Sequence, residues 1–188
     1  MIARETDTVR VATPLDAEAM ARVEVATWRA SYAGILPALH LGSMSVPRAQ
    51  ARWLRTIGMA RSDALAITLV AERGGEVIGF ASGGARLGPT PRMARLDMLY
   101  VLPAAQRVGA GRSLLCAFAL RAVDAGVSSM WLDVLANNDP GRRFYRAMGG
   151  IELARTWRFW GTKPLVEVSY GWSLPAGIER MGASIEPR

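Results

Sequence analysis

The spacing of apolar and polar residues along the chain predicts seven strands and four helices. Strands are expected where apolar residues run together or alternate with polar ones, between glycine, proline or charged positions. These segments are 8–12, 66–72, 77–82, 96–101, 129–135, 151–159 and 165–172. Helices are expected where apolar residues recur every three or four positions, in two cases after a capping residue and a proline. These segments are 14–32, 47–61, 113–122 and 139–149.

The order of these elements indicates a mixed α/β (α+β) fold. The strands 66–72 and 77–82 are separated by a glycine pair and should form a hairpin, as should the last two strands around Gly161. By contrast, the strands 96–101 and 129–135 are joined by a helix, so they should run parallel through a right-handed crossover. The sequence therefore predicts antiparallel hairpins together with one parallel pair.

Length and composition favour a single domain. The chain has 188 residues, of which 51% are hydrophobic, and this is enough for a substantial core. We expect residues 1–188 to form one domain, with its core at about 8–174 and a loose tail at 175–188, where glycine and proline recur. No apolar run reaches the ~18 residues that span a bilayer. The first residues are polar and acidic, so we expect no secretory signal, no membrane association and a cytoplasmic location.

Charge and cysteine content narrow the classes of function. The formal net charge is +7, from 23 Lys and Arg against 16 Asp and Glu. The arginines are spread along the chain without a basic block, so we expect an anionic cofactor rather than nucleic acid as the ligand. The single cysteine, Cys116, lies in an apolar helix, and the single histidine, His40, lies in an expected surface loop. This composition predicts neither a disulfide framework nor a metal site.

The segment after the strand 96–101 has the residues of an anion-binding turn. Pro103 ends the strand, because proline cannot donate a ladder hydrogen bond. Next comes Gln106-x-x-Gly109-x-Gly111, named here the glycine turn (106–111), whose glycines allow positive φ and close approach of a ligand. The first amides of the following helix have no intrahelical acceptor and lie at the positive end of its dipole. The turn lacks the lysine of a Walker loop and the third glycine of a dinucleotide fingerprint.

Two motifs together resemble the GNAT family of acetyltransferases. The glycine turn is similar to the family's Arg/Gln-x-x-Gly-x-Gly/Ala pyrophosphate loop. Residues 134–149 are similar to its V-x-x-x-N-x-x-A-x-x-F-Y-x-x-x-G-F segment, and the order of elements over about 9–174 is also that of the family. The chain departs from the pattern at Gly141, where alanine is usual, and at Gly150, where an aromatic ring is usual. We expect Ile151 to replace that ring.

The resemblance implies the family's fold and cofactor. The fold is a mixed, mostly antiparallel sheet of about seven strands with a splayed parallel pair, flanked by about four helices. Acetyl-CoA (coenzyme A) would lie where the strands 96–101 and 129–135 splay, with its pyrophosphate on the glycine turn and two arginine side chains adding contacts to phosphate. The residues that the resemblance implies for cofactor binding are Leu99, Val101, Gln106, Arg107, Val108, Gly109, Ala110, Gly111, Arg112 and Asn138.

The resemblance also implies acetyl transfer to a primary amine of a small molecule or peptide, by direct attack in a ternary complex. Tyr145 is expected to protonate the departing thiolate, because a phenol of pKa ~10 can donate to a thiolate whose acid has a pKa of ~8.5. Many relatives carry a glutamate base where this chain has Arg95, so the nearest carboxylate, Asp97, is the candidate base. Asp133, Glu167 and a water chain without a dedicated base remain alternatives.

Aromatic residues near the end of the first helix are candidates for the acceptor site. Trp28 and Tyr32 are four positions apart and share a helix face, where their rings can hold a cationic amine. Glu167, on the last strand, is the third substrate candidate. The resemblance also favours a homodimer. Two other functions stay open: a non-catalytic coenzyme A-binding or regulatory module on the same fold, and a nucleic-acid binder.

Overall fold

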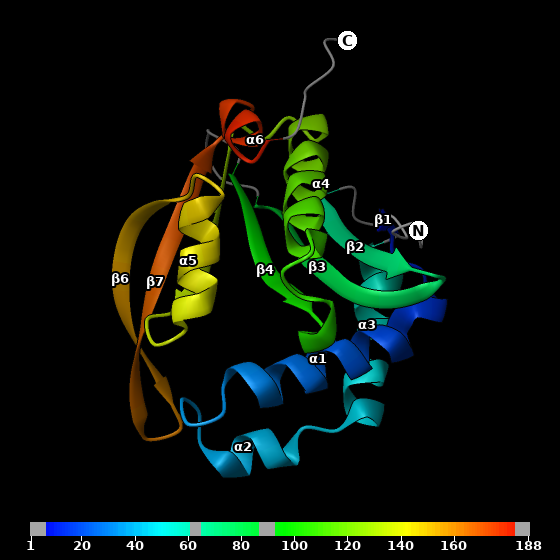
Figure 1. The fold of residues 1–188 in the computed structure, drawn as a ribbon, viewed down its shortest axis with the longest axis vertical. Helices are drawn as coiled ribbons and strands as arrows, with labels where there is room; N and C mark the ends of the chain where they lie inside the picture. The colour runs from blue at the N-terminus through cyan, green and yellow to red at the C-terminus, as the bar shows by residue number, and fades with distance from the viewer. Residues whose placement is uncertain (1–6, 61–64, 87–92, 183–188) are drawn as a thin grey trace, which may run out of the picture.

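Seven strands form a single sheet in the computed structural model, which describes residues 7–60, 65–86 and 93–182 (Figure 1). The strands are β1 (Thr8–Val11), β2 (Ala66–Arg73), β3 (Glu76–Arg86), β4 (Met93–Val101), β5 (Ser129–Leu135), β6 (Ile151–Trp160) and β7 (Lys163–Ser173). The helices are α1 (Ala17–Ser31), α2 (Ala38–Ser43), α3 (Val46–Ala60), α4 (Ala110–Asp124), α5 (Asp139–Ala147) and α6 (Ala176–Arg180). The strand order is β1-β2-β3-β4-β5-β7-β6, and the described pairs are antiparallel except β4 with β5. The predicted mixed sheet is therefore confirmed.

Helices cover both faces of the sheet over β2, β3 and β4. α4 packs on one face, in the same core cluster as Leu69 and Ala71 of β2. α1 and α3 pack on the other face, with Val70 of β2 and Phe80 of β3. Successive residues of a strand point to opposite faces, which is why β2 is a nearly continuous apolar run rather than an alternating one. Within the described ranges, none of the helices has the length and apolar character needed to cross a membrane.

β4 and β5 pair over only three residues and then separate. The parallel ladder ends at Arg95 and Trp131, although both strands continue beyond these residues. The separation coincides with a bulge in β4, in which Asp97 is the extra residue opposite Ser82 and Gly83 of β3. A bulge bends its strand and redirects the residues that follow it. The splay of the parallel pair therefore has a local cause within β4.

Gly83 gives the bulge the space that it needs. A Cβ atom at this position would lie 2.1 Å from the carbonyl oxygen of Arg95 and 3.0 Å from the Cα atom of Leu96. We expect Gly83→Ala to lower the free energy of unfolding by about 1–3 kcal/mol, because a clash with backbone atoms cannot be relieved by rotating a side chain. Urea denaturation measures this change. The matched control is Gly58→Ala in α3, where nothing lies within 4 Å of the new Cβ atom and the helix should gain stability. An unchanged unfolding midpoint for Gly83→Ala would contradict the prediction.

Two short helices lie where the sequence predicts irregular chain. α2 occupies the expected loop around His40. α6 occupies part of the expected loose tail, and that prediction is wrong for the described residues, since Ile178 and Met181 are 0% and 1% exposed within the core cluster of α4. Two apolar residues on one helical turn dock this segment, a pattern too short to stand out in the sequence. Residues 183–188 of the expected tail lie outside the described part of the chain, as do residues 1–6, to which the expectation of no secretory signal applies.

The aromatic ring that the motif lacks at Gly150 is supplied by Trp172. Ile151 is 62% exposed, so the prediction that it fills this space is wrong. Trp172 on β7 lies beside Gly150, with its Cζ2 atom 2.6 Å from the position that a Cβ atom would take. Its Nε1 donates a hydrogen bond to the Met148 carbonyl at 2.9 Å, which fixes the ring at the end of α5. The replacement comes from a distant strand, so the local motif cannot reveal it.

Candidate active site

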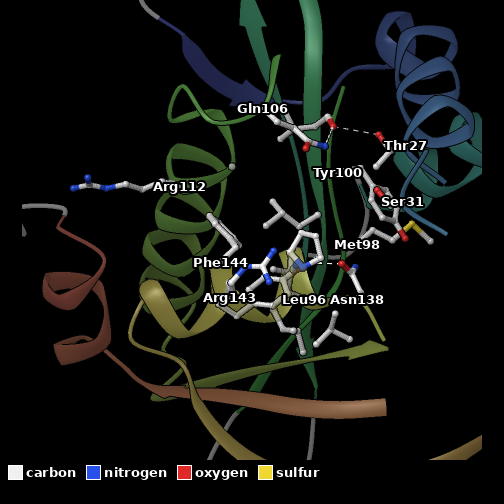
Figure 2. Close-up of a pocket in the computed structure, with 18 of the residues that line it drawn as sticks. Thr27, Ser31, Leu96, Met98, Tyr100, Gln106, Arg112, Asn138, Arg143 and Phe144 are labelled. Carbon is white, nitrogen blue, oxygen red and sulfur yellow. Dashed lines mark hydrogen bonds between the residues drawn. The ribbon is translucent and has the colours of Figure 1, made fainter. Parts of the chain in front are cut away.

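A cavity of about 570 Å³ opens where β4 and β5 separate (Figure 2). Its walls come from β4, β5, the end of α1, the glycine turn and the first turns of α4 and α5. The volume is that of an ordinary small-molecule site. The predicted cofactor-binding residues that line it are Leu99, Val101, Gln106, Arg107, Gly109, Gly111, Arg112 and Asn138. Of the other two, Val108 is exposed and Ala110 is buried.

The β4 edge of the cavity presents main-chain groups that no strand pairs in the described part of the chain. The amide of Leu102 donates to a carbonyl of β3 at 2.8 Å. Because main-chain groups alternate in direction along a strand, those of Leu99 and Val101 face the gap. The Val101 carbonyl accepts from Gln106 Nε2 at 3.0 Å and from Thr27 Oγ1 at 3.3 Å (Figure 2). The Gln106 side chain thus ties the glycine turn to β4, and the Val101 amide and both groups of Leu99 are available to a ligand.

The glycine turn lines the cavity with main-chain atoms, because Gly109 and Gly111 have no side chains. Gly109 is the N-cap of α4, with a φ of +109°, and Arg107 has a φ of +68°, which is uncommon for a residue other than glycine. Ser113 donates to the Gly109 carbonyl at 3.0 Å, so the amides of residues 110–112 precede the hydrogen-bonded part of the helix. Together with the positive end of the α4 dipole, these amides form a site suited to a phosphate or diphosphate.

The arginine side chains near the glycine turn point in different directions. Arg112 points away from the cavity (Figure 2), and its Nη2 donates to the Gly182 carbonyl at 2.7 Å. The structure therefore does not support the predicted contact between its guanidinium and phosphate, and only the Arg112 amide stays at the turn. Arg143, which was not among the predicted site residues, lines the cavity from α5 (Figure 2). Arg107 lines it from the glycine turn. The position of Arg143 in the early part of a helix that starts beside the gap is the signal that could have identified it.

Tyr145 lies in the wall of the cavity on α5. Its ring packs against Phe144, Tyr170 and Trp172, at centroid distances of 5.2, 6.1 and 6.3 Å. Burial raises the pKa of Tyr145 well above its ordinary value, and nearby Tyr32 adds to this shift. The phenol is therefore protonated through the neutral range, as a proton donor must be.

Polar groups from α1, β4 and α5 meet on another wall of the cavity. Asn138 caps α5, because its Oδ1 accepts from the Gly141 amide at 3.0 Å. A Cβ atom at Gly141 would lie 2.9 Å from Asn138 Nδ2, so the glycine that replaces the usual alanine makes room for this cap. Burial raises the pKa of Tyr32 above its ordinary value. Hydrogen bonds with Asn138 and Tyr100 act in the opposite direction but do not cancel this effect. Asn138 thus has a structural task in addition to its predicted contact with the cofactor.

Two aspartates line the cavity, and Arg95 pairs with both. Arg95 Nε lies 3.3 Å from Asp97 Oδ1, and Arg95 Nη2 donates to Asp133 Oδ2 at 3.2 Å. Ser169 Oγ donates to the other oxygen of Asp133 at 2.6 Å. Asp97 therefore reaches the cavity, as a base must, but one of its oxygens faces a guanidinium.

Two of the three substrate candidates, Trp28 and Tyr32, belong to an aromatic cluster with residues of α2 and the end of β6. Four rings, those of Trp28, Tyr32, His40 and Trp160, form a cluster with neighbouring centroids 5.1–5.9 Å apart. Among these four, Tyr32 lines the cavity, whereas Trp28 packs behind it with the apolar residues of the α1–α2 connection. Glu167 is engaged in an ion pair at 3.1 Å and is not among the residues that line the cavity. The structure thus brings Tyr32, and not Trp28 or Glu167, to the cavity wall.

Known proteins resemble this chain in sequence and in fold. The family model described as the acetyltransferase (GNAT) family matches residues 35–149. The uncharacterized N-acetyltransferase YuaI of Bacillus subtilis is 34% identical over 168 residues, which cover 88% of this chain and 92% of YuaI. The PaiA N-acetyltransferase of Thermoplasma acidophilum, solved with coenzyme A, has a TM-score of 0.71 at 22% identity, over 86% of this chain and 98% of its own. YncA of Salmonella typhimurium, solved with acetyl-CoA, has a TM-score of 0.66 at 22% identity, over 90% of this chain and 94% of its own. These two structures show that the fold is shared.

Proposed function

The chain belongs to the acetyltransferase (GNAT) family, and from this premise we propose that it transfers an acetyl group from acetyl-CoA to a primary amine of a small molecule or peptide. The observation that supports this most strongly is the end of the β4–β5 ladder at Arg95, which opens a cavity that the glycine turn and the first turn of α4 also line. The two amide groups of a pantetheine arm can pair with an open strand edge, and a diphosphate can accept hydrogen bonds from the amides at a helix N-terminus.

The residues around the cavity fit acetyl-CoA. The amides of residues 110–112 would hold the diphosphate, and Arg107 and Arg143 would add charge-assisted contacts. The Val101 amide and the main-chain groups of Leu99 would bind the pantetheine arm as a neighbouring strand would. When bound there, acetyl-CoA supplies an acetyl group activated as a thioester.

The chemistry requires a neutral nucleophile, an oxyanion donor and a proton for the leaving group. The acceptor must arrive as a free amine, because an ammonium of pKa ~10 has no lone pair. The Leu99 amide would donate to the thioester oxygen while the new C–N bond forms and charge develops on that oxygen. As the C–S bond breaks, Tyr145 would give its proton to the thiolate. The acceptor nitrogen loses one proton, through Asp97 or a water chain, and solvent returns one to Tyr145, so the protons balance.

Release of the coenzyme A thiol in the presence of acetyl-CoA and a panel of amines tests the proposal. The panel should contain polyamines, amino acids, amino-sugar antibiotics and peptides with a free N-terminus. We expect turnover with at least one member, and mass spectrometry should show one added acetyl group on that amine. Coenzyme A binding without turnover on any amine would favour the alternative, a non-catalytic coenzyme A-binding module. A protein that does not bind coenzyme A would contradict both interpretations.

A further inference from the structure

The Arg95 side chain joins β4 to β5 at the point where their main chains part. The ladder ends at Arg95 and Trp131, so no further main-chain pair joins the two strands in the described part of the chain. From this position the guanidinium reaches Asp133 on β5, at 3.2 Å, and Asp97 in the bulge of β4, at 3.3 Å. It also lies over the Trp131 ring, 4.8 Å from the centroid. One side chain thus contacts both sides of the opening.

The groups around this guanidinium are themselves held in place. Asp133 is fixed by Ser169 of β7, at 2.6 Å, and its side chain is 13% exposed. The backbone of Arg95 approaches β3 at Gly83 more closely than any side chain there would allow. A guanidinium is planar, with donors in fixed directions, so it sets the separation of two carboxylates more strictly than a lysine ammonium does. Arg95 Nη2 makes a directed hydrogen bond to Asp133, whereas Nε has no hydrogen-bond partner in the described part of the chain and approaches Asp97 only as an ion pair. The guanidinium thus holds Asp133 by direction and attracts Asp97 by charge.

We propose that Arg95 is a positioning residue that sets the width of the gap between β4 and β5. Leu99 follows Arg95 by four positions along the same strand, so the divergence of β4 decides where the main-chain groups of Leu99 and Val101 meet the pantetheine arm. This inference rests on the proposed function, because the arm is that of acetyl-CoA. It gives the two aspartates a structural task that does not depend on either of them acting as a base.

Arg95→Met tests the proposal, because it removes the charge and the donors but keeps a long apolar chain over Trp131. We expect the dissociation constant for coenzyme A, measured by isothermal titration calorimetry, to rise about tenfold, and kcat to fall about tenfold or more, since small misplacements at a reacting centre are costly. Arg95→Lys restores the charge without the planar fork, so it should recover the melting temperature more fully than the dissociation constant. All measurements are made at temperatures where each variant is folded.

Arg155→Met is the matched control. Arg155 pairs with Glu152 at 2.7 Å on β6, and β7 separates β6 from the gap. This variant should therefore keep the wild-type dissociation constant for coenzyme A and the wild-type kcat. If Arg95→Met lowers the melting temperature but leaves the dissociation constant and kcat within about twofold of the wild type, the proposal is overturned and Arg95 only stabilises the sheet. Should Arg95→Met fail to fold, the dissociation constant and the melting temperature of Asp133→Asn decide, because this variant removes the partner on β5. Its kcat is not used, since Asp133 is also a candidate base. Failure of the proposed function is a different result: the wild type itself would then neither bind coenzyme A nor acetylate any amine.

Discussion

Replacing Tyr145 by phenylalanine should lower kcat for acetyl transfer by about 10²-fold or more and leave the dissociation constant for coenzyme A nearly unchanged. The substitution removes one hydroxyl group, while the ring keeps its packing against Phe144 and Trp172. Burial raises the pKa of Tyr145, so the donating, protonated form is present below that raised pKa and is lost only above it. We therefore also expect no loss of kcat from this group as the pH rises from 7 toward 10. Steady-state kinetics over this pH range measures both effects.

Tyr170→Phe is the matched control for Tyr145→Phe. Tyr170 is a buried phenol on β7, its ring centroid lies 6.1 Å from that of Tyr145, and it is not among the residues that line the cavity. Tyr170→Phe should keep kcat within about twofold of the wild type, since the Tyr170 hydroxyl cannot reach the leaving group. Equal losses in the two variants would indicate a packing effect. An unchanged kcat in Tyr145→Phe would assign the protonation of the thiolate to water.

Gly109→Ala should weaken coenzyme A binding by about tenfold or more. Gly109 has a φ of +109°, and nothing lies within 4 Å of a Cβ atom built there, so the cost comes from backbone strain rather than from a clash. Such strain costs about 1–3 kcal/mol for a residue with a side chain, and the turn would relax to relieve it. The amides of residues 110–112 follow directly, so relaxation would turn them away from the diphosphate. Isothermal titration calorimetry with coenzyme A measures the change.

Gly75→Ala separates this binding effect from a general loss of stability. Gly75 lies in the β2–β3 turn with a φ of +81°, and nothing lies within 4 Å of a Cβ atom there either. The substitution should therefore lower the melting temperature, as Gly109→Ala does, but keep the dissociation constant of the wild type. If Gly109→Ala also binds coenzyme A like the wild type, the glycine turn is not the diphosphate site.

The fold could be predicted largely from local patterns. The Gly74-Gly75 turn fixes a hairpin, Pro103 ends β4, and the apolar helix between β4 and β5 requires a parallel crossover. Each of these features depends on neighbours in the sequence. α6 was missed because its formation depends on a core to which Ile178 can dock, and that core exists only in the folded chain.

The site could be predicted in its backbone and less well in its side chains. The glycine turn and the open edge of β4 follow from glycine, proline and strand geometry, which the sequence displays directly. The partners of long charged side chains do not, because they are chosen by distant segments. Arg112 contacts Gly182, and Arg95 contacts Asp133, over separations of 70 and 38 residues. A pattern within a short window contains no information about such pairs.

Helix α6 decides how far the chain can be shortened for production or crystallisation. Ile178 and Met181 are buried, and Gly182 accepts a hydrogen bond from Arg112, in the first turn of the helix that carries the glycine turn. A truncation after residue 174 would expose the apolar surface against which Ile178 and Met181 pack, and it would remove the hydrogen bond that Arg112 donates to Gly182. Lost binding in such a fragment would be mistaken for a lack of affinity. Shortened versions should keep every residue up to Gly182.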